Sequence, residues 1–167
     1  DAIEADAAFT VVPGLACTVQ VADCMPVLLA SRDASIVGAA HAGWRGAAGG
    51  VVERLAREMC DAAGLEPRDL HAWMGPCIGP AHFEVGADVL DAFTGHAACF
   101  TEAPRPDGAM RWLADLPAIV RSKLAAVGIE SIAGGTWCTV AHPLRFYSYL
   151  RDGLTGRHAA AVWIRAR

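Results

Sequence analysis

Apolar and polar positions along the chain follow two periods, one typical of helices and one typical of strands. Between residues 46 and 63, apolar side chains recur at helical spacing with charged residues between them. The apolar positions of this stretch are Val52, Leu55, Ala56, Met59 and Ala63. The pattern predicts one amphipathic helix that ends at Gly64. A second long helix is predicted over residues 115–127, with Pro117 in its first turn, and a short one over 87–93.

Short apolar runs bounded by glycine, proline and polar residues predict strands. These runs span residues 15–21, 26–30, 35–40, 70–74 and 131–140. Residues 146–150 and 158–164 predict a hairpin, and residues 101–109 predict a loop because they contain prolines and a glycine. Strands therefore alternate with helices, which predicts one compact α/β unit.

The composition limits the class of protein. The chain has 167 residues, typical of one domain, and its net charge of −4 gives no support for a nucleic-acid or anionic-membrane partner. Although 54% of the residues are hydrophobic, charged and histidine side chains interrupt every apolar run before about 18 residues, so we expect no membrane-spanning helix. The first residues also lack the basic start and apolar run of a signal peptide.

Six cysteines are scattered along the chain without a Cys-x-x-Cys pair. This share of cysteine is well below that of disulfide-stabilised scaffolds. We therefore expect free thiols and a reducing, cytoplasmic location.

Two segments combine reactive side chains with glycine or proline where strands are expected to end. In Ala22-Asp23-Cys24-Met25-Pro26, the proline cannot donate a ladder hydrogen bond, so we expect the strand to break and to turn Cys24 out of the sheet. His41-Ala42-Gly43-Trp44-Arg45-Gly46 precedes the long helix, and the helix N-terminus together with Arg45 suits an anion. A buried structural cysteine and a structural histidine are the alternatives.

Cys24 and His41 lie at the ends of consecutive predicted strands, so their side chains can lie close together. A thiolate and an imidazole are two of the three protein ligands that a catalytic zinc takes. The same two groups form a nucleophile–base pair when no metal is present. The spacing alone does not separate these two chemistries.

Two further segments carry polar side chains. Gly75-Pro76-Cys77-Ile78-Gly79-Pro80 predicts a rigid turn that shapes a pocket floor, with Cys77 either a packed thiol or a second ligand. In Tyr147-Ser148-Tyr149-Leu150-Arg151-Asp152, a strand would place Ser148 opposite its neighbouring tyrosines. Arg151 is either a binding group or a member of a structural ion pair.

Taken together and in this order, the motifs resemble those of the YfiH family along essentially the whole chain. They are Ala22-Asp23-Cys24-Met25-Pro26-Val27, His41-Ala42-Gly43-Trp44-Arg45-Gly46, Gly75-Pro76-Cys77-Ile78-Gly79-Pro80 with Phe83-Glu84-Val85-Gly86, and Phe146-Tyr147-Ser148-Tyr149 with Arg151-Asp152 and Thr155-Gly156-Arg157. Members were long labelled multicopper polyphenol oxidases or laccase-domain proteins, and bacterial members are also called peptidoglycan editing factors. The resemblance implies a zinc-containing purine nucleoside phosphorylase with adenosine deaminase activity. It also implies a single-domain layered α/β sandwich of mixed sheet and helices, similar to the catalytic domain of cytotoxic necrotizing factor.

The resemblance assigns roles to named residues. Cys24 and His41 match two family metal ligands, for zinc rather than copper. The other roles are assigned from side-chain chemistry: Arg45 and Asp23 are the expected catalytic residues, Arg45 to hold phosphate with the adjacent helix N-terminus and Asp23 to orient a ligand or to take a proton. The residues expected to contact substrate are Trp44, Cys77, Ser148 and Arg151. The implied partners are small molecules: phosphate and a purine nucleoside such as inosine, adenosine or methylthioadenosine.

The chain departs from the family pattern at three places. The third family ligand, a histidine in a Gln-Val-His-Gly stretch upstream of the other two, has no counterpart in residues 1–167. Leu150 stands where the family commonly has Arg, and Val21 where Thr is usual. Because the chain also lacks a starting Met, we expect a single YfiH-like domain without its N-terminal segment, and a longer parent chain that supplies the histidine.

Two other functions remain as hypotheses. One is a metal-free Cys–His hydrolase or amidase acting on a cell-wall-precursor-like substrate, and the other is a non-catalytic module that retains the pocket. A copper polyphenol oxidase is disfavoured because two or three N/S ligands do not make a multicopper cluster and the chain has no His-x-His pair.

Overall fold

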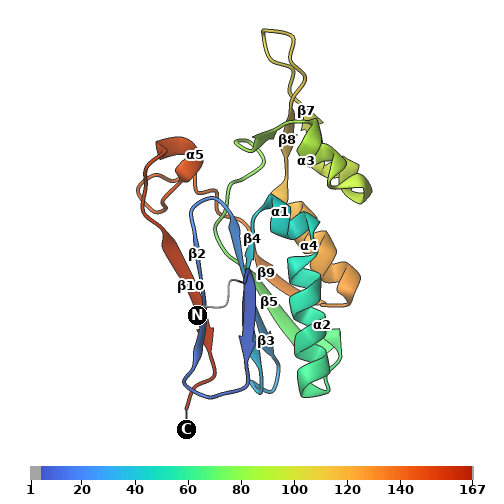
Figure 1. Ribbon diagram of the computed structural model, residues 1–167, viewed down its shortest axis with the longest axis vertical. Helices are drawn as coiled ribbons and strands as arrows, with labels where there is room; N and C mark the ends of the chain where they lie inside the picture. The colour runs from blue at the N-terminus through green and yellow to red at the C-terminus, as the bar shows by residue number, and fades with distance from the viewer. Residues whose placement is uncertain (1–4, 167) are drawn as a thin grey trace.

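A five-stranded sheet forms the centre of the computed structural model, which describes residues 5–166 (Figure 1). The strand order is β1-β4-β3-β5-β9, and every neighbouring pair is antiparallel except the parallel pair β5–β9. The strands are β1 (Ala7–Thr10), β3 (Met25–Ser31), β4 (Val37–Ala42), β5 (Leu70–Met74) and β9 (Ser131–Gly134). The expected single α/β domain with a mixed sheet and helices is therefore what the chain forms.

Helices cover one face of this sheet and a two-stranded ribbon lies on the other side (Figure 1). The helices are α1 (Trp44–Ala48), α2 (Val51–Ala63) and α4 (Leu116–Val127), and the ribbon is the antiparallel pair β2 (Ala16–Val21) and β10 (His158–Trp163). β3 is largely buried because it lies between β4 and β5. A fully buried side chain such as Leu29 contributes about 2 kcal/mol to the stability of the fold. Among the described residues, none of the helices has the length and apolarity needed to cross a membrane.

A small antiparallel sheet stands at one end of the molecule (Figure 1). Its strands are β6 (Glu84–Val85), β7 (Phe100–Glu102) and β8 (Trp112–Ala114), with α3 (Ala87–Asp91) and the 3-10 helix η2 (Thr94–Cys99) beside them. The remaining short helices are η1 (Pro67–Asp69) and α5 (Tyr149–Asp152). The loop expected over 101–109 begins only after β7, because Thr101 and Glu102 pair with β8.

The helix expected over residues 46–63 is in fact two helices. Its apolar face is buried as predicted, but α1 ends at Ala48 and α2 begins at Val51. Gly50 lies between them with φ of 81°, a left-handed conformation that interrupts a right-handed helix. The motif that holds Arg45 therefore begins a helix of only five residues, and the long-helix N-terminus expected there is absent from it.

The expected hairpin over residues 146–164 is wrong. Tyr149–Asp152 forms α5, and Ser148 caps it by accepting a hydrogen bond from the Arg151 N–H at 3.1 Å. β10 pairs with β2, which lies more than 130 residues earlier. The pattern of apolar and polar residues within a strand does not predict so distant a pairing partner. The strand expected over 131–140 ends at Gly134, which has φ of 80°.

The break between β2 and β3 comes before Pro26 rather than at it. Pro26 lies inside β3, opposite His41 on β4. The chain turns at residues 22–24, where Asp23 has φ of 88°. This conformation is uncommon for a residue other than glycine, and aspartate is among the side chains that tolerate it. The turn places Cys24 directly before β3.

Candidate functional site

The structure brings Cys24 and His41 to one cavity where β3 begins and β4 ends. In the register of these strands Met25 lies opposite Ala42, so Cys24 lies beside Gly43. The cavity has a volume of about 200 Å³ and is lined by Asp6, Cys24, His41, Gly43, Trp44, Arg45 and Gly46. The side chains of the two motifs that the sequence singles out thus face a common space.

Gly43 leaves room beside the Cys24 thiol. A Cβ added at Gly43 would lie 2.9 Å from Cys24 Sγ, closer than real Cβ atoms approach a neighbouring atom. A residue with a side chain would therefore push the sulfur away from its position. The motif has glycine at this position because the backbone at Gly43 lies so close to Cys24.

The Cys24 thiol is held in its protonated form. Burial raises the pKa of the thiol, and the carboxylates of Asp23 and Asp6 raise it further because they repel a thiolate. The Arg157 guanidinium acts in the opposite direction, but the net direction is upward. A free thiolate nucleophile is therefore disfavoured at neutral pH, whereas a bound cation would favour the thiolate.

His41 is paired with Asp6 on the neighbouring strand segment. The His41 backbone N–H donates to the Asp6 carbonyl oxygen at 2.8 Å, which continues the β1–β4 pairing by one residue. The His41 Nδ1 atom lies 3.4 Å from Asp6 Oδ1. The sequence offered no signal for this carboxylate, since Asp6 lies 35 residues before His41.

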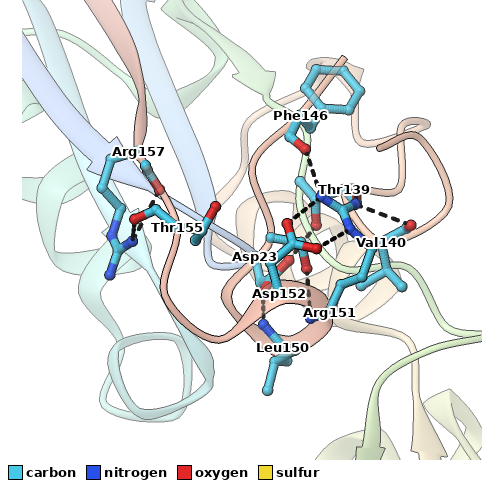
Figure 2. A network of polar contacts seen from close by, with 11 residues as sticks. Asp23, Thr139, Val140, Phe146, Leu150, Arg151, Asp152, Thr155 and Arg157 are labelled. Atoms are coloured by element: carbon cyan, nitrogen blue, oxygen red, sulfur yellow. Dashed lines mark hydrogen bonds and ion pairs between the residues drawn. The ribbon is translucent and has the colours of Figure 1, made fainter. Parts of the chain in front are cut away.

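Asp23 joins Thr139 and Leu150 through a buried carboxylate (Figure 2), and its backbone carbonyl joins a third part of the chain. Its Oδ1 accepts a hydrogen bond from the Thr139 hydroxyl at 2.6 Å, and its Oδ2 accepts one from the Leu150 N–H at 2.7 Å. Its backbone carbonyl accepts a third from the Ile78 N–H at 2.8 Å. These bonds fix the backbone that directly precedes Cys24.

Arg151 is engaged within the same network (Figure 2). Its guanidinium donates to the backbone carbonyls of Thr139, Val140 and Phe146 at 2.7, 3.2 and 3.1 Å. It also binds both carboxylate oxygens of Asp152, and this contact holds the pKa of the Asp152 carboxyl below its usual value. Ser148 is fully buried as the α5 cap. The structure thus shows Arg151 and Ser148 ordering the segment 139–152, outside the set of residues that lines the cavity of Cys24.

Cys77 is joined to this network through its backbone, because its carbonyl accepts a hydrogen bond from the Thr139 N–H at 2.9 Å. It is fully buried, and burial raises the pKa of its thiol strongly. Cys77 pairs with Cys138 across an isolated β-bridge, and Cys138 Sγ accepts hydrogen bonds from the Gly79 and Ala141 N–H groups at 3.2 and 3.5 Å. Cys138 was not singled out from the sequence because its partners lie far away along the chain.

Arg45 and Trp44 line the same cavity as Cys24 and His41. The Arg45 guanidinium stacks over the Trp44 ring, with its central carbon 4.3 Å from a ring centroid. Arg45 also lines a neighbouring cavity of about 680 Å³ between β1 and the helices, and Asp6 and Gly46 border both cavities. The guanidinium therefore stands where the small cavity and the large one meet.

The donor set of the small cavity suits a soft or borderline metal. Cys24 supplies sulfur and His41 supplies an imidazole nitrogen, and the missing Cβ of Gly43 leaves space at the sulfur. Between residues 5 and 166, no group of three His, Cys, Asp or Glu side chains is arranged to hold a metal ion. The described residues thus fit two positions of a zinc site.

The comparisons with known proteins agree with the motifs. Residues 1–165 match the family described as multi-copper polyphenol oxidoreductase laccase. The chain is 43% identical over 166 residues to a purine nucleoside phosphorylase of Pseudomonas aeruginosa, and 43% identical over 160 residues to the purine nucleoside phosphorylase YfiH of Escherichia coli. These matches cover 97% and 96% of this chain but 66% and 64% of the two relatives, so the chain spans just under two thirds of their length.

Solved structures show the same fold. A crystal structure of a Neisseria meningitidis protein is similar with a TM-score of 0.88 at 42% identity, covering 98% of this chain and 66% of that one. YlmD from Geobacillus stearothermophilus is similar with a TM-score of 0.87 at 30% identity, covering 96% of this chain and 61% of that one. The resemblance carried by the motifs is confirmed: the chain is similar to proteins named YfiH, and it belongs to the family described as multi-copper polyphenol oxidoreductase laccase.

Proposed function

We propose that this chain carries the catalytic centre of a zinc-dependent purine nucleoside phosphorylase. The observation that carries the proposal is the cavity shared by the Cys24 thiol, the His41 imidazole and the Arg45 guanidinium. The substrate class comes from the names of the relatives, which are purine nucleoside phosphorylases at 43% identity.

Cys24 and His41 are the residues that would hold the zinc ion. Catalytic zinc sites take three protein ligands and keep one position open, so we expect a third donor from outside residues 5–166. When bound, the metal supplies Lewis acidity and lowers the pKa of a water molecule toward neutrality. The raised pKa of the Cys24 thiol supports a metal role, since this sulfur needs a cation to become a thiolate.

Arg45 is the candidate phosphate-binding residue. Its side chain is exposed and, among residues 5–166, no carboxylate forms an ion pair with it. A guanidinium binds two phosphate oxygens at once, and stacking on Trp44 limits its motion. In phosphorolysis of inosine, a phosphate oxygen forms a bond to ribose C1′ while the C1′–N9 bond breaks and hypoxanthine leaves. Arg45 would hold that phosphate.

The larger cavity beside Arg45 would take the nucleoside. Its volume of about 680 Å³ is within the range of small-molecule sites. Asp6, Arg45 and Gly46 border it and the small cavity alike, so a nucleoside there lies next to the proposed metal ligands. Trp44 at the small cavity offers an aromatic face for the base or sugar.

Asp23 supports the site by position. Both of its carboxylate oxygens are occupied by hydrogen bonds from Thr139 and Leu150, so its role is to fix the backbone before Cys24. Arg151 and Ser148 extend that support through the segment 139–152. Of the two roles expected for Asp23, orienting a ligand and taking a proton, these hydrogen bonds favour the first.

We include adenosine deaminase activity in the proposal because the same donor set suits it. Deamination replaces the amino group at purine C6 with the oxygen of water and releases ammonia. It needs an activated water beside the base, which Cys24 and His41 would position through the metal. The free state of all six cysteines supports a reducing compartment such as the cytoplasm.

A metal-free Cys–His hydrolase is the second candidate, and the expected similarity to the catalytic domain of cytotoxic necrotizing factor belongs to it. One observation favours it: Cys24 and His41 share one cavity. The carboxylates of Asp23 and Asp6 weigh against it, because they raise the pKa of the Cys24 thiol. We therefore rank it below the zinc enzyme.

The test is hypoxanthine release from inosine by the purified full-length protein, with and without phosphate. We expect release that depends on phosphate, that falls at least 100-fold in Cys24→Ala and that a strong chelator abolishes (on the order of the loss from removing one catalytic group). Cys99→Ala, which removes another half-buried thiol, is the matched control and should retain activity. Phosphate-independent turnover that survives metal removal but not thiol alkylation would instead establish the hydrolase.

A further inference from the structure

We propose that Asp6 is a positioning residue that holds the proton of the His41 imidazole on Nδ1 and directs Nε2 toward the metal position beside Cys24. The inference rests on the proposed zinc site for its functional meaning. The pairing of Asp6 with His41 is an observation of the fold and stands without the metal.

Two contacts fix Asp6 against His41. The hydrogen bond from the His41 N–H to the Asp6 carbonyl, at 2.8 Å, sets the two residues side by side where β1 begins and β4 ends. The Asp6 carboxylate then reaches the ring, with Oδ1 3.4 Å from Nδ1. The backbone hydrogen bond fixes the position of Asp6, and its carboxylate then contacts Nδ1 of the His41 ring.

A carboxylate at Nδ1 selects one form of the neutral imidazole. It can only accept a hydrogen bond, so it favours the tautomer with the proton on Nδ1. The lone pair of Nε2 is then free to bind a cation, and the ring is held in one orientation. Metal-binding histidines commonly make such a bond through the nitrogen that does not touch the metal.

Asp6 acts through His41 rather than as a ligand of its own. It lines the same cavity as Cys24 and His41, yet these three residues do not form a group able to hold a metal ion. Its negative charge lies at the cavity that Cys24 and His41 also line. A cation between Cys24 and His41 would be attracted by the same charge.

The side chain of Asp6 can be changed without removing the strand pairing, because the bond to His41 N–H uses the backbone carbonyl. Asp6→Ala is therefore expected to fold and to retain β1. Glu58→Ala is the matched control. Glu58 is another exposed carboxylate, it lines the neighbouring large cavity, and its ion pair is with Arg54.

The first measurement is the tautomer of His41 in the metal-free protein, from the ¹⁵N resonances of the imidazole at about pH 8.5, where an ordinary imidazole is neutral. We expect the Nδ1–H form in the wild type and in Glu58→Ala, and a shift toward the Nε2–H form in Asp6→Ala. An unchanged tautomer in Asp6→Ala would overturn the proposal.

The second measurement is zinc affinity, from competition with a chromophoric chelator. We expect Asp6→Ala to bind zinc about 10- to 100-fold more weakly and Glu58→Ala to bind it as the wild type does, with both variants keeping the thermal stability of the metal-free wild type. Equal weakening in both variants would show a general charge effect and refute positioning. If the wild type binds no zinc, the zinc proposal fails, while the tautomer measurement still decides whether Asp6 sets the state of His41.

Discussion

At the scale of single residues, two positions decide where the Cys24 sulfur lies. Asp23 holds the preceding backbone in a left-handed conformation and ties it to Thr139 and Leu150. Gly43 leaves the space that the sulfur occupies. The chemistry of the thiol therefore depends on neighbours that have no reactive role themselves.

Gly43→Ala should displace the Cys24 thiol. The added Cβ would lie 2.9 Å from Sγ, and relief of such overpacking costs about 1–3 kcal/mol of stability. We expect the free energy of zinc binding to weaken by more than the free energy of unfolding falls, because the sulfur moves from its place. Gly95→Ala is the control, since a Cβ there meets nothing within 4 Å. Unchanged zinc affinity in Gly43→Ala would show that this contact does not position the sulfur.

Asp23→Ala should destabilise the whole fold. The change leaves the Thr139 hydroxyl and the Leu150 N–H without their acceptor, and loss of hydrogen bonds to a charged group costs about 3 kcal/mol here. The free energy of unfolding, from urea titration, measures the effect. Asp61→Ala on the exposed side of α2 should stay within about 0.5 kcal/mol of the wild type. A similarly small change in Asp23→Ala would contradict the role given to Asp23.

Part of this arrangement is visible in the sequence. A cysteine and a histidine at the ends of consecutive strands pointed to one site, and the register of β3 and β4 explains why they meet. Asp6 carries no local signal, because only strand pairing brings it to His41. Arg151 was expected either to bind substrate or to belong to a structural ion pair. It pairs with Asp152 and donates to the carbonyls of Thr139, Val140 and Phe146, while its contact with substrate stays a prediction.

At the scale of elements, α2 and α4 pack side by side against the sheet and share a shielded ion pair. Lys123 Nζ of α4 lies 2.7 Å from Glu53 Oε1 of α2, and both side chains are only 15% exposed. Lys123 is the one lysine of the chain. The second oxygen of Glu53, Oε2, is buried and has no hydrogen-bond partner among the described residues. Among the described residues, Lys123 is therefore the cation that pairs with the Glu53 carboxylate.

Lys123→Ala should destabilise the helix layer by about 3 kcal/mol, because it leaves the Glu53 carboxylate shielded and unpaired. Adding Glu53→Leu should recover part of that loss, since the stranded charge is then removed. Thermal unfolding of the single and double variants checks both statements. A double variant less stable than Lys123→Ala would mean that the ion pair is not the cause.

Elements with a strong local period were predictable, and those defined by distant partners were not. The apolar face of α2 follows directly from its helical spacing, whereas the break at Gly50 required the backbone conformation. The strand predicted over residues 158–164 is confirmed as β10, but the hairpin prediction assigned it the wrong partner. β10 pairs with β2, and the residues before it form α5 because Ser148 caps a helical turn.

At the scale of the whole molecule, the sheet lies between the ribbon and the helix layer (Figure 1), and the proposed site lies where β3 begins and β4 ends. The turn between β2 and β3 supplies Cys24, β4 supplies His41, and α1 supplies Arg45. Segment 139–152, far along the chain, secures the turn through Asp23. Residues from both ends of the described chain thus converge on the start of β3, which local sequence pattern alone does not show.

The zinc content of the purified full-length protein tests the central claim most directly. Elemental analysis should find zinc equimolar with the wild type and with Cys99→Ala, and little or none in Cys24→Ala and His41→Ala. Added zinc at 100 times its dissociation constant should stabilise the wild type by about 2.7 kcal/mol and leave Cys24→Ala unchanged. Equimolar zinc in Cys24→Ala would contradict the account, because the metal would then lie elsewhere in the protein.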